Sequence, residues 1–177
     1  MEWTLGADQQ GVTEIDGRWL TIPRTLCFVR YKGEVLLMKR SPTRRIFPNL
    51  YNGVGGHIER WEDPYQAATR EILEETGLEV RDLRLRGIHN IDVGADNGIM
   101  MFVFTATTNT SDFVDPGVEG TLHWIPVESI DTLDLVEDLP FVLPRILAMR
   151  LNDPPYYAHV SYDDSDTIRI QFSNESR

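Results

Sequence analysis

Three glutamates crowded onto one face of a short helix constrain this chain more than any other feature of its sequence. Residues 63–76 are predicted to be helical, because an aspartate and a proline at the start make a good N-cap and first-turn pair and a glycine follows the last residue. At about 100° per residue, Glu71, Glu74 and Glu75 fall within about a third of the circumference. Glutamates at these spacings repel one another by roughly a few tenths of a kcal/mol per pair, so this face is expected to have a positively charged partner.

The rest of this helix is predicted to pack against the protein, through Ala68, Ile72, Leu73 and Thr76. A hard divalent cation, Mg²⁺ or Mn²⁺, would reverse the repulsion on the acidic face, since it binds carboxylate oxygens and keeps waters that a phosphate can displace. Arg70 lies on the flank of that face and could orient one carboxylate by a bidentate contact. Glutamate-rich faces can also be merely solvated, and the three glutamates alone do not decide between these readings.

The balance of charge argues against a nucleic acid polymer as the ligand. The 177 residues include 28 acidic and 17 basic side chains, for a formal net charge of -11. A protein that holds a long phosphate backbone by neutralising its charge needs the opposite balance. A small anion that arrives together with a metal ion remains compatible with this composition.

Length and cysteine usage predict a single domain in a reducing compartment. A chain of this size fits one domain over residues 1–177, with residues 1–18 as a peripheral N-terminal segment. Cys27, the single cysteine, cannot form an internal disulfide and is expected to be a small buried side chain in an apolar run. We therefore expect a cytoplasmic protein, and no signal-like start or long apolar segment predicts secretion or membrane insertion.

The pattern of strands and turns predicts a mixed sheet with two separated helices. Residues 25–31 and 34–39 flank Lys32 and Gly33 and are predicted to form a hairpin. Pro144 lies inside the second helical pattern, so that helix should begin near Pro144 or bend there. Such an arrangement is typical of an α+β or α/β sandwich. The remaining predicted elements are strands at 78–91, 99–107 and 121–127, a second helix at 139–151, and a hairpin of 158–162 with 167–173.

The spacing of residues around the first helix resembles a known signature. Residues 55–78 match the Nudix box at every specified position, and are therefore similar to the Nudix hydrolase family. This resemblance implies a three-layer α/β/α sandwich with a mixed sheet, and Mg²⁺-dependent hydrolysis, with Mn²⁺ as an alternative metal, of a nucleoside diphosphate linked to another group. The matching positions are Gly56, Glu62, Arg70, Glu71, Ile72, Glu74, Glu75, Gly77 and Leu78.

The resemblance also implies roles for the site residues. Glu74 and Glu75 would be metal ligands, assisted by the backbone carbonyl of Gly55, and Glu71 would be a further ligand or would position the attacking water. The catalytic set is then these three glutamates with Arg70. Glu119 stands where the family has an acidic residue near the metals, although a role at the loop surface is an open alternative.

Four further stretches are similar in order and spacing to the oxidised purine nucleoside triphosphatases. Asn52 and Asp138 would read the purine edge in that branch, because an amide both donates and accepts and a carboxyl adds protonation-dependent pairing. Asn52 could instead be only a turn residue, and Asp138 only a helix cap. The stretches are YNGVGGH at 51–57, EGTLHW at 119–124, VEDLPFVLP at 136–144 and DTIRI at 166–170.

The contacts expected for the rest of the substrate are less well defined. Lys39 and the arginine after it could reach phosphates, although strand ends are commonly basic. Val136 stands where better-known relatives have an aromatic lid over the base, and the loop at 40–50 is longer than theirs. Stacking on the base would then come from Tyr51 or Phe47. These departures argue against selectivity for 8-oxo-dGTP more than they argue against hydrolysis of nucleotides in general.

Three functions remain open. The first is a Nudix pyrophosphohydrolase that converts purine nucleoside triphosphates, with oxidised bases of the 8-oxo-dGTP type as candidates, to monophosphate and pyrophosphate. The second is hydrolysis of nucleotide sugars or dinucleoside polyphosphates, which is less favoured because no proline occurs between Gly77 and Asp115, where several sugar-nucleotide branches have one. The third is a non-catalytic nucleotide-binding module, a class that tends to lose box glutamates. In each case the partner is a small nucleotide rather than a nucleic acid polymer or a membrane, and the oligomeric state is left open.

Overall fold

The strands of this protein form one mixed sheet. The structure is a computed structural model and describes residues 10–11, 17–114 and 117–173. The strand order is β3-β2-β1-β5-β4-β7-β8, and β6 also pairs with β2. The pairs β1–β5 and β4–β7 are parallel and the other pairs are antiparallel. In chain order the strands are β1 (Leu20–Tyr31), β2 (Glu34–Arg40), β3 (Tyr51–Asn52), β4 (Arg81–Ile91), β5 (Asn97–Thr107), β6 (Gly120–Pro126), β7 (Tyr156–Tyr162) and β8 (Ile168–Phe172).

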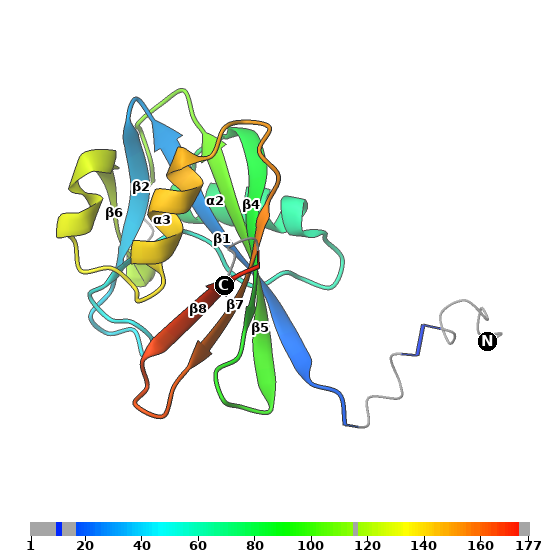
Figure 1. Cartoon of the computed structure of the whole chain (residues 1–177). Helices are drawn as coiled ribbons and strands as arrows, with labels where there is room; N and C mark the ends of the chain where they lie inside the picture. The colour runs from blue at the N-terminus through cyan, green and yellow to red at the C-terminus, as the bar shows by residue number, and fades with distance from the viewer. Residues whose placement is uncertain (1–9, 12–16, 115–116, 174–177) are drawn as a thin grey trace.

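Both faces of the sheet are buried, each under one helix. In β1, Leu26 and Phe28 pack in a cluster with α3 (Leu139–Ala148), while Cys27 and Val29 pack in a cluster with α2 (Pro64–Thr76). Neighbouring strand residues point to opposite faces, so this apolar run lies at the centre of three layers. Figure 1 shows α2 and α3 on opposite sides of the sheet. The α/β/α sandwich expected from the sequence is confirmed.

The predicted hairpin at the start of the sheet is confirmed, and its two strands separate soon after the turn. Lys32 and Gly33 both have positive φ, 45° and 88°, as a tight hairpin turn requires. Only the residues next to the turn pair β1 with β2, and β1 then runs parallel to β5. The segment 54–57 takes the place beside β1 that β2 has left, through bonds such as Cys27 N–H to the Val54 carbonyl at 2.7 Å. This insertion brings the glycines before α2 into the sheet.

The boundaries predicted for α2 are confirmed. The Asp63 carboxylate accepts hydrogen bonds from the amides of Tyr65 and Gln66 at 2.8 and 2.9 Å, and the Gln66 side chain accepts from the Asp63 amide at 3.0 Å. This reciprocal pair satisfies amides that have no partner inside the helix. At the other end Gly77 has φ 70° and donates to the Leu73 carbonyl at 2.8 Å.

The packing predicted for one residue of α2 is wrong. Leu73 is 50% exposed, whereas Ala67, Ala68, Ile72 and Thr76 are buried. Leu73 is turned about 100° further round the helix than Ile72, which places it beyond the buried stripe and towards solvent. The helix is in contact with the sheet over a narrower face than its apolar residues suggest.

The prediction for the second helix is confirmed at its start and needs one correction at its end. The helix begins at Leu139, the first residue of the predicted range, and runs through Pro144. It ends at Ala148, three residues before the predicted end, because Met149 is extended and the Asp153 carboxylate accepts a hydrogen bond from the Arg150 amide at 2.8 Å, which turns the chain. A proline within the helix removes one amide donor but does not prevent a helix whose buried face packs well.

The other predicted elements agree with the structure to within three residues at each end. These are β4, β5, β6, and the hairpin of β7 with β8. Two 3-10 helices, η1 (Gly117–Glu119) and η2 (Val127–Thr132), flank β6. The predicted peripheral segment 1–18 lies mostly outside the described residues. None of the helices described is long and apolar enough to cross a membrane.

A buried histidine in β4 should make the stability of this protein depend on pH. His89 is fully buried with Nε2 2.8 Å from the Tyr156 hydroxyl, and its Nδ1 has no partner in the described part of the chain. Burial lowers the pKa of His89 from 6.5 to about 4. The folded state therefore binds this proton less readily than the unfolded state, so the contribution is complete above pH 6.5 and is lost as the pH falls towards 4.

We expect His89 to account for on the order of 2 kcal/mol of lost unfolding free energy between pH 7 and pH 4.5. Urea unfolding at both pH values, in the wild type and in His89→Gln, measures this contribution as the difference between the two pH-dependent losses. Carboxylates titrate equally in both proteins and cancel in the comparison. An identical loss in the two proteins would show that His89 is not the titrating group.

Candidate active site

Two glycines bring the backbone before α2 close to its glutamates. Gly55 has φ 139°, and a Cβ there would lie 2.4 Å from the Thr25 carbonyl oxygen of β1. The Gly55 amide donates to a Glu75 carboxylate oxygen at 3.0 Å. A Cβ on Gly56 would lie 2.5 Å from a Glu71 carboxylate oxygen. Side chains at these two positions would therefore displace the strand or the glutamates.

Glu75 lies in an environment that opposes its charge. Burial, together with the charges of Glu71 and Glu119, raises the pKa of Glu75 to about 7, while the Gly55 amide and the Arg40 guanidinium act in the opposite direction. Burial and like charges both favour the protonated acid. The carboxylate of Glu75 with those of Glu71 and Glu119 offers hard oxygen donors, which fit a divalent cation.

Arg70 links the glutamates of the box. It forms a bidentate pair with Glu62, at 3.0 Å from Nε and 2.6 Å from Nη2, and also donates to Glu71 at 2.9 Å and Glu74 at 3.0 Å. Its remaining bond, at 3.2 Å, goes to the His57 carbonyl. The bidentate partner is thus Glu62, a residue of the box for which no role in the site was predicted. Such a fork fixes a planar guanidinium with little remaining freedom.

The three glutamates of α2 do not converge in this conformation. The Glu71 side chain is 14% exposed whereas that of Glu74 is 60% exposed and directed to Arg70. Among the described residues no group of three acidic, histidine or cysteine side chains stands ready to hold a metal ion. The carboxylates are instead occupied by Arg70 and by the Gly55 amide. Their chemistry fits a divalent ion, and their side-chain positions would have to change to bind it.

Glu119 approaches this cluster from η1. Strand pairing sets Arg40 of β2 opposite Gly120, which holds η1 against the end of β2. The Glu119 carboxylate forms a two-point pair with Arg44 at 3.1 and 3.2 Å. Its effect on the pKa of Glu75 shows that the predicted acidic residue does lie near the α2 glutamates. Arg40 was predicted as a possible phosphate contact, whereas no site role was predicted for Arg44.

The residues predicted to read the base lie on neighbouring segments. The Tyr51 amide and carbonyl bond to residues 134 and 136 at 2.8 and 3.0 Å, so β3, which contains Asn52, runs alongside the segment leading to Asp138. The Asn52 side-chain oxygen accepts from the Gly53 amide at 2.9 Å, and Asn52 itself is the last residue of β3. Asp138 is the first residue before α3 but makes no side-chain capping bond. Burial raises the pKa of Asp138 to about 6.

The other predicted substrate contacts surround the same strand. Lys39 Nζ lies 5.7 Å from the centre of the Tyr51 ring, which also meets His123 edge-on at 5.6 Å. Phe47 is partly buried against the core cluster of α3. Tyr51 is also partly buried against this cluster, so both aromatic rings lie at the edge of the core.

Comparison with known proteins identifies the family. Residues 21–146 match the model of the NUDIX domain. The chain belongs to the Nudix family. Nudix hydrolases act on pyrophosphate bonds of nucleoside diphosphate derivatives and generally use divalent metal ions such as Mg²⁺. The expected fold and the expected enzyme class are thus both confirmed.

Relatives of this Nudix chain differ in the substrates that their names give. An m7GpppN-mRNA hydrolase of Xenopus laevis is 37% identical over 70 residues, which are 40% of this chain and 24% of the frog protein. An oxidized purine nucleoside triphosphate hydrolase of Mus musculus is 29% identical over 150 residues, which are 81% of this chain and 88% of the mouse protein. The chain therefore spans about a quarter of the first relative and most of the second.

A solved structure shows the same fold. The MutT protein of Bacillus halodurans superimposes with a TM-score of 0.74 at 23% identity, covering 88% of this chain and 99% of that one. At this identity the likeness establishes the fold alone.

Proposed function

We propose that this Nudix hydrolase converts purine nucleoside triphosphates, those with oxidised bases included, to the monophosphate and pyrophosphate. The observation that carries the proposal is the buried, charge-repelled Glu75 held against Gly55, with Glu71 and Glu119 close enough to raise its pKa. The match over 81% of this chain to a mouse enzyme named for oxidized purine nucleoside triphosphates supports the substrate class. We also propose that residues 1–177 act as one domain and, from the single buried cysteine, that the protein is cytoplasmic.

The proposed metal site uses residues from three segments. Its ligands would be the Gly55 carbonyl and the carboxylates of Glu71, Glu74, Glu75 and Glu119. When bound, a divalent ion neutralises charge on phosphoryl oxygens and lowers the pKa of a water molecule. Glu71 has the alternative role of positioning the attacking water.

Within the chain itself, Arg70 would hold the catalytic glutamates in place. Its contacts with Glu62, Glu71 and Glu74 fix these carboxylates relative to the loop before α2. The side chains of Glu62 and Glu71 are only 7% and 14% exposed, so these two carboxylates are less accessible to solvent than that of Glu74. We expect Arg70 to act through the positions of its partners rather than through the substrate.

Base recognition is proposed for Asn52 and Asp138. A carboxyl with a pKa of about 6 exists in both protonation states near neutral pH, so Asp138 can donate a hydrogen bond to a purine edge as well as accept one. To offer its carbonyl oxygen to a base, Asn52 would give up the bond from the Gly53 amide. Tyr51 and Phe47 would stack on the base, and Lys39 would contact phosphate.

Hydrolysis of dinucleoside polyphosphates or nucleotide sugars is a second candidate. The 37% identity to an mRNA cap hydrolase favours the dinucleoside polyphosphates, because a cap joins two nucleosides through phosphates. A non-catalytic nucleotide-binding module is the third candidate and is not favoured, because every glutamate of the box is present.

A nucleotide panel with Mg²⁺ and chromatographic identification of products tests the proposal. Purine triphosphates, with and without oxidised bases, should give monophosphate and pyrophosphate. Release of two phosphorylated fragments from a dinucleoside polyphosphate or a sugar nucleotide, without turnover of triphosphates, would replace the first candidate by the second. Saturable binding without turnover of any compound would support the third.

A further inference from the structure

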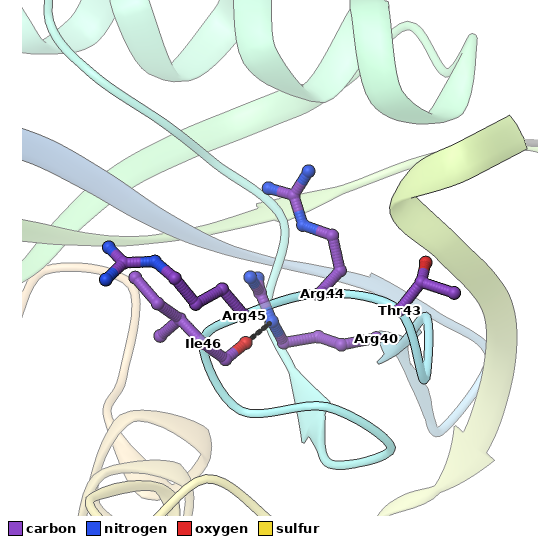
Figure 2. A pocket seen from close by; sticks show the side chains of 5 residues that line it. All are labelled: Arg40, Thr43, Arg44, Arg45 and Ile46. Carbon is purple, nitrogen blue, oxygen red and sulfur yellow. Dashed lines mark hydrogen bonds between the residues drawn. The ribbon is translucent and has the colours of Figure 1, made fainter.

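Three arginines lie close together at the end of β2 and in the loop that leads to β3, and the proposed chemistry gives no role to the two in the loop. Arg40 and residues 43–46 line an open cavity of about 290 Å³ (Figure 2). We call this cavity the arginine pocket. It is lined by Arg40, Thr43, Arg44, Arg45 and Ile46.

The loop around the arginine pocket is held in shape by its own hydrogen bonds. The Arg40 amide donates to the Leu50 carbonyl at 3.0 Å, and the Asn49 amide donates back to the Arg40 carbonyl at 3.1 Å. Asn49 and Phe47 have positive φ, 63° and 51°, which lets the chain reverse direction here. Because Phe47 also packs on the core, the arginines are presented by an anchored loop.

The positive charge of the arginine pocket is only partly neutralised. Arg44 is paired with Glu119. Arg40 donates to the Ile46 carbonyl at 2.9 Å, which satisfies one N–H without cancelling its charge (Figure 2). In the part of the chain that the structure describes, Arg45 has no ion pair and no side-chain hydrogen bond. Among the described residues, only Arg44 of these three arginines is paired with a carboxylate, so in a protein of net charge -11 the group keeps a local positive charge that attracts an anion.

The arginine pocket is adjacent to the proposed catalytic cluster. Arg44 contacts Glu119, and the charges of Glu119 and Arg40 both act on Glu75. An anion in the pocket would therefore be a group of the same ligand that meets the α2 glutamates. Guanidinium forks bind phosphate oxygens in two-point contacts, which makes phosphate the group that this pocket fits.

We propose that the arginine pocket is a phosphate subsite that takes the terminal phosphate of a substrate with at least three phosphates in a row. This inference rests on the proposed function, in which the scissile bond lies between the first two phosphates. The third phosphate then extends from the glutamate cluster into the loop. The pocket thus favours nucleoside triphosphates over diphosphates of the same base.

The test compares dGTP with dGDP as substrates in the presence of Mg²⁺. Arg45→Gln, an exposed change that leaves the fold untouched, should lower the ratio of kcat/KM for dGTP to that for dGDP at least about tenfold, the scale of one charge-assisted bond to phosphate. Arg44→Gln with Arg45→Gln should lower it further. Lys32→Gln, in the turn at the opposite end of β2, removes one positive charge and should leave the ratio unchanged.

A binding measurement separates this inference from the proposed function. Calorimetry with inorganic tripolyphosphate and no metal should give a dissociation constant about tenfold weaker in Arg45→Gln than in the wild type or Lys32→Gln. An unchanged ratio together with an unchanged dissociation constant overturns the subsite. Absence of nucleotide turnover, with tripolyphosphate binding still lost in Arg45→Gln, overturns the proposed function and leaves the subsite standing.

Discussion

Replacing Glu75 by glutamine should reduce kcat for Mg²⁺-dependent hydrolysis by about 10³-fold or more, with no loss of folded structure. The change removes the charge that a divalent ion needs, and charge neutralisation at phosphorus supplies several kcal/mol of the rate enhancement in such reactions. Glutamine keeps a side-chain oxygen that can accept from the Gly55 amide, so the loop before α2 should stay in place. Steady-state kinetics and circular dichroism of the purified variant measure both parts of the expectation.

Glu79→Gln is the matched control for this variant. Glu79 is exposed just beyond α2, so the same chemical change there should leave kcat within about twofold of the wild type. The free energy of unfolding of Glu75→Gln without metal should equal or exceed that of the wild type, because a buried charge with a raised pKa has been removed. Turnover of Glu75→Gln within tenfold of the wild type would remove Glu75 from the metal site.

Replacing Gly55 by alanine should destabilise the protein by about 3–5 kcal/mol. A φ of 139° is almost confined to glycine and costs an alanine about 1–3 kcal/mol. The new Cβ would also lie 2.4 Å from the Thr25 carbonyl oxygen, a backbone atom of the central strand that cannot move without disturbing the sheet. Urea unfolding monitored by fluorescence gives the change in free energy of unfolding, and activity should fall in parallel because Glu75 loses its amide partner.

Gly94→Ala separates the two causes. Gly94 also has positive φ, 71°, but an added Cβ would meet no atom within 4 Å. The expected loss there is about 1–2 kcal/mol, from backbone conformation alone. If the two variants lose the same free energy of unfolding, the close approach of Gly55 to β1 contributes nothing to stability, and this expectation is wrong.

Much of the fold could be predicted from the sequence because its signals are local. The cap at Asp63, the glycine at 77 and the turn at Lys32 act through neighbours in the chain, and each is where the sequence placed it. Leu73 and the end of α3 were predicted wrongly because burial and helix termination there depend on distant partners. The periodicity of apolar residues and their helix propensity do not determine how much of the helix surface the sheet will cover.

The candidate site divides in the same way. The glutamates at 71, 74 and 75 could be singled out because one motif holds them all within a single helix. The resemblance pointed to Glu119, but its pair with Arg44 could not be predicted, because the two residues are 75 positions apart in the chain. The choice of Glu62 as the bidentate partner of Arg70 could not be predicted either, because it depends on how the loop before α2 folds back on the helix.

By itself, the sequence determined the family, the helix that bears the carboxylates and the glycines that precede it, since these depend on residue types at short spacings. Only the tertiary structure decided which carboxylates are buried, which are held by an arginine, and which basic side chains stand next to them. The physical reason is that burial and the local electrostatic field depend on all the atoms around a group, including those from distant parts of the chain. In this protein β2 separates from β1 after the turn, and the glycine segment before α2 pairs with β1 in its place.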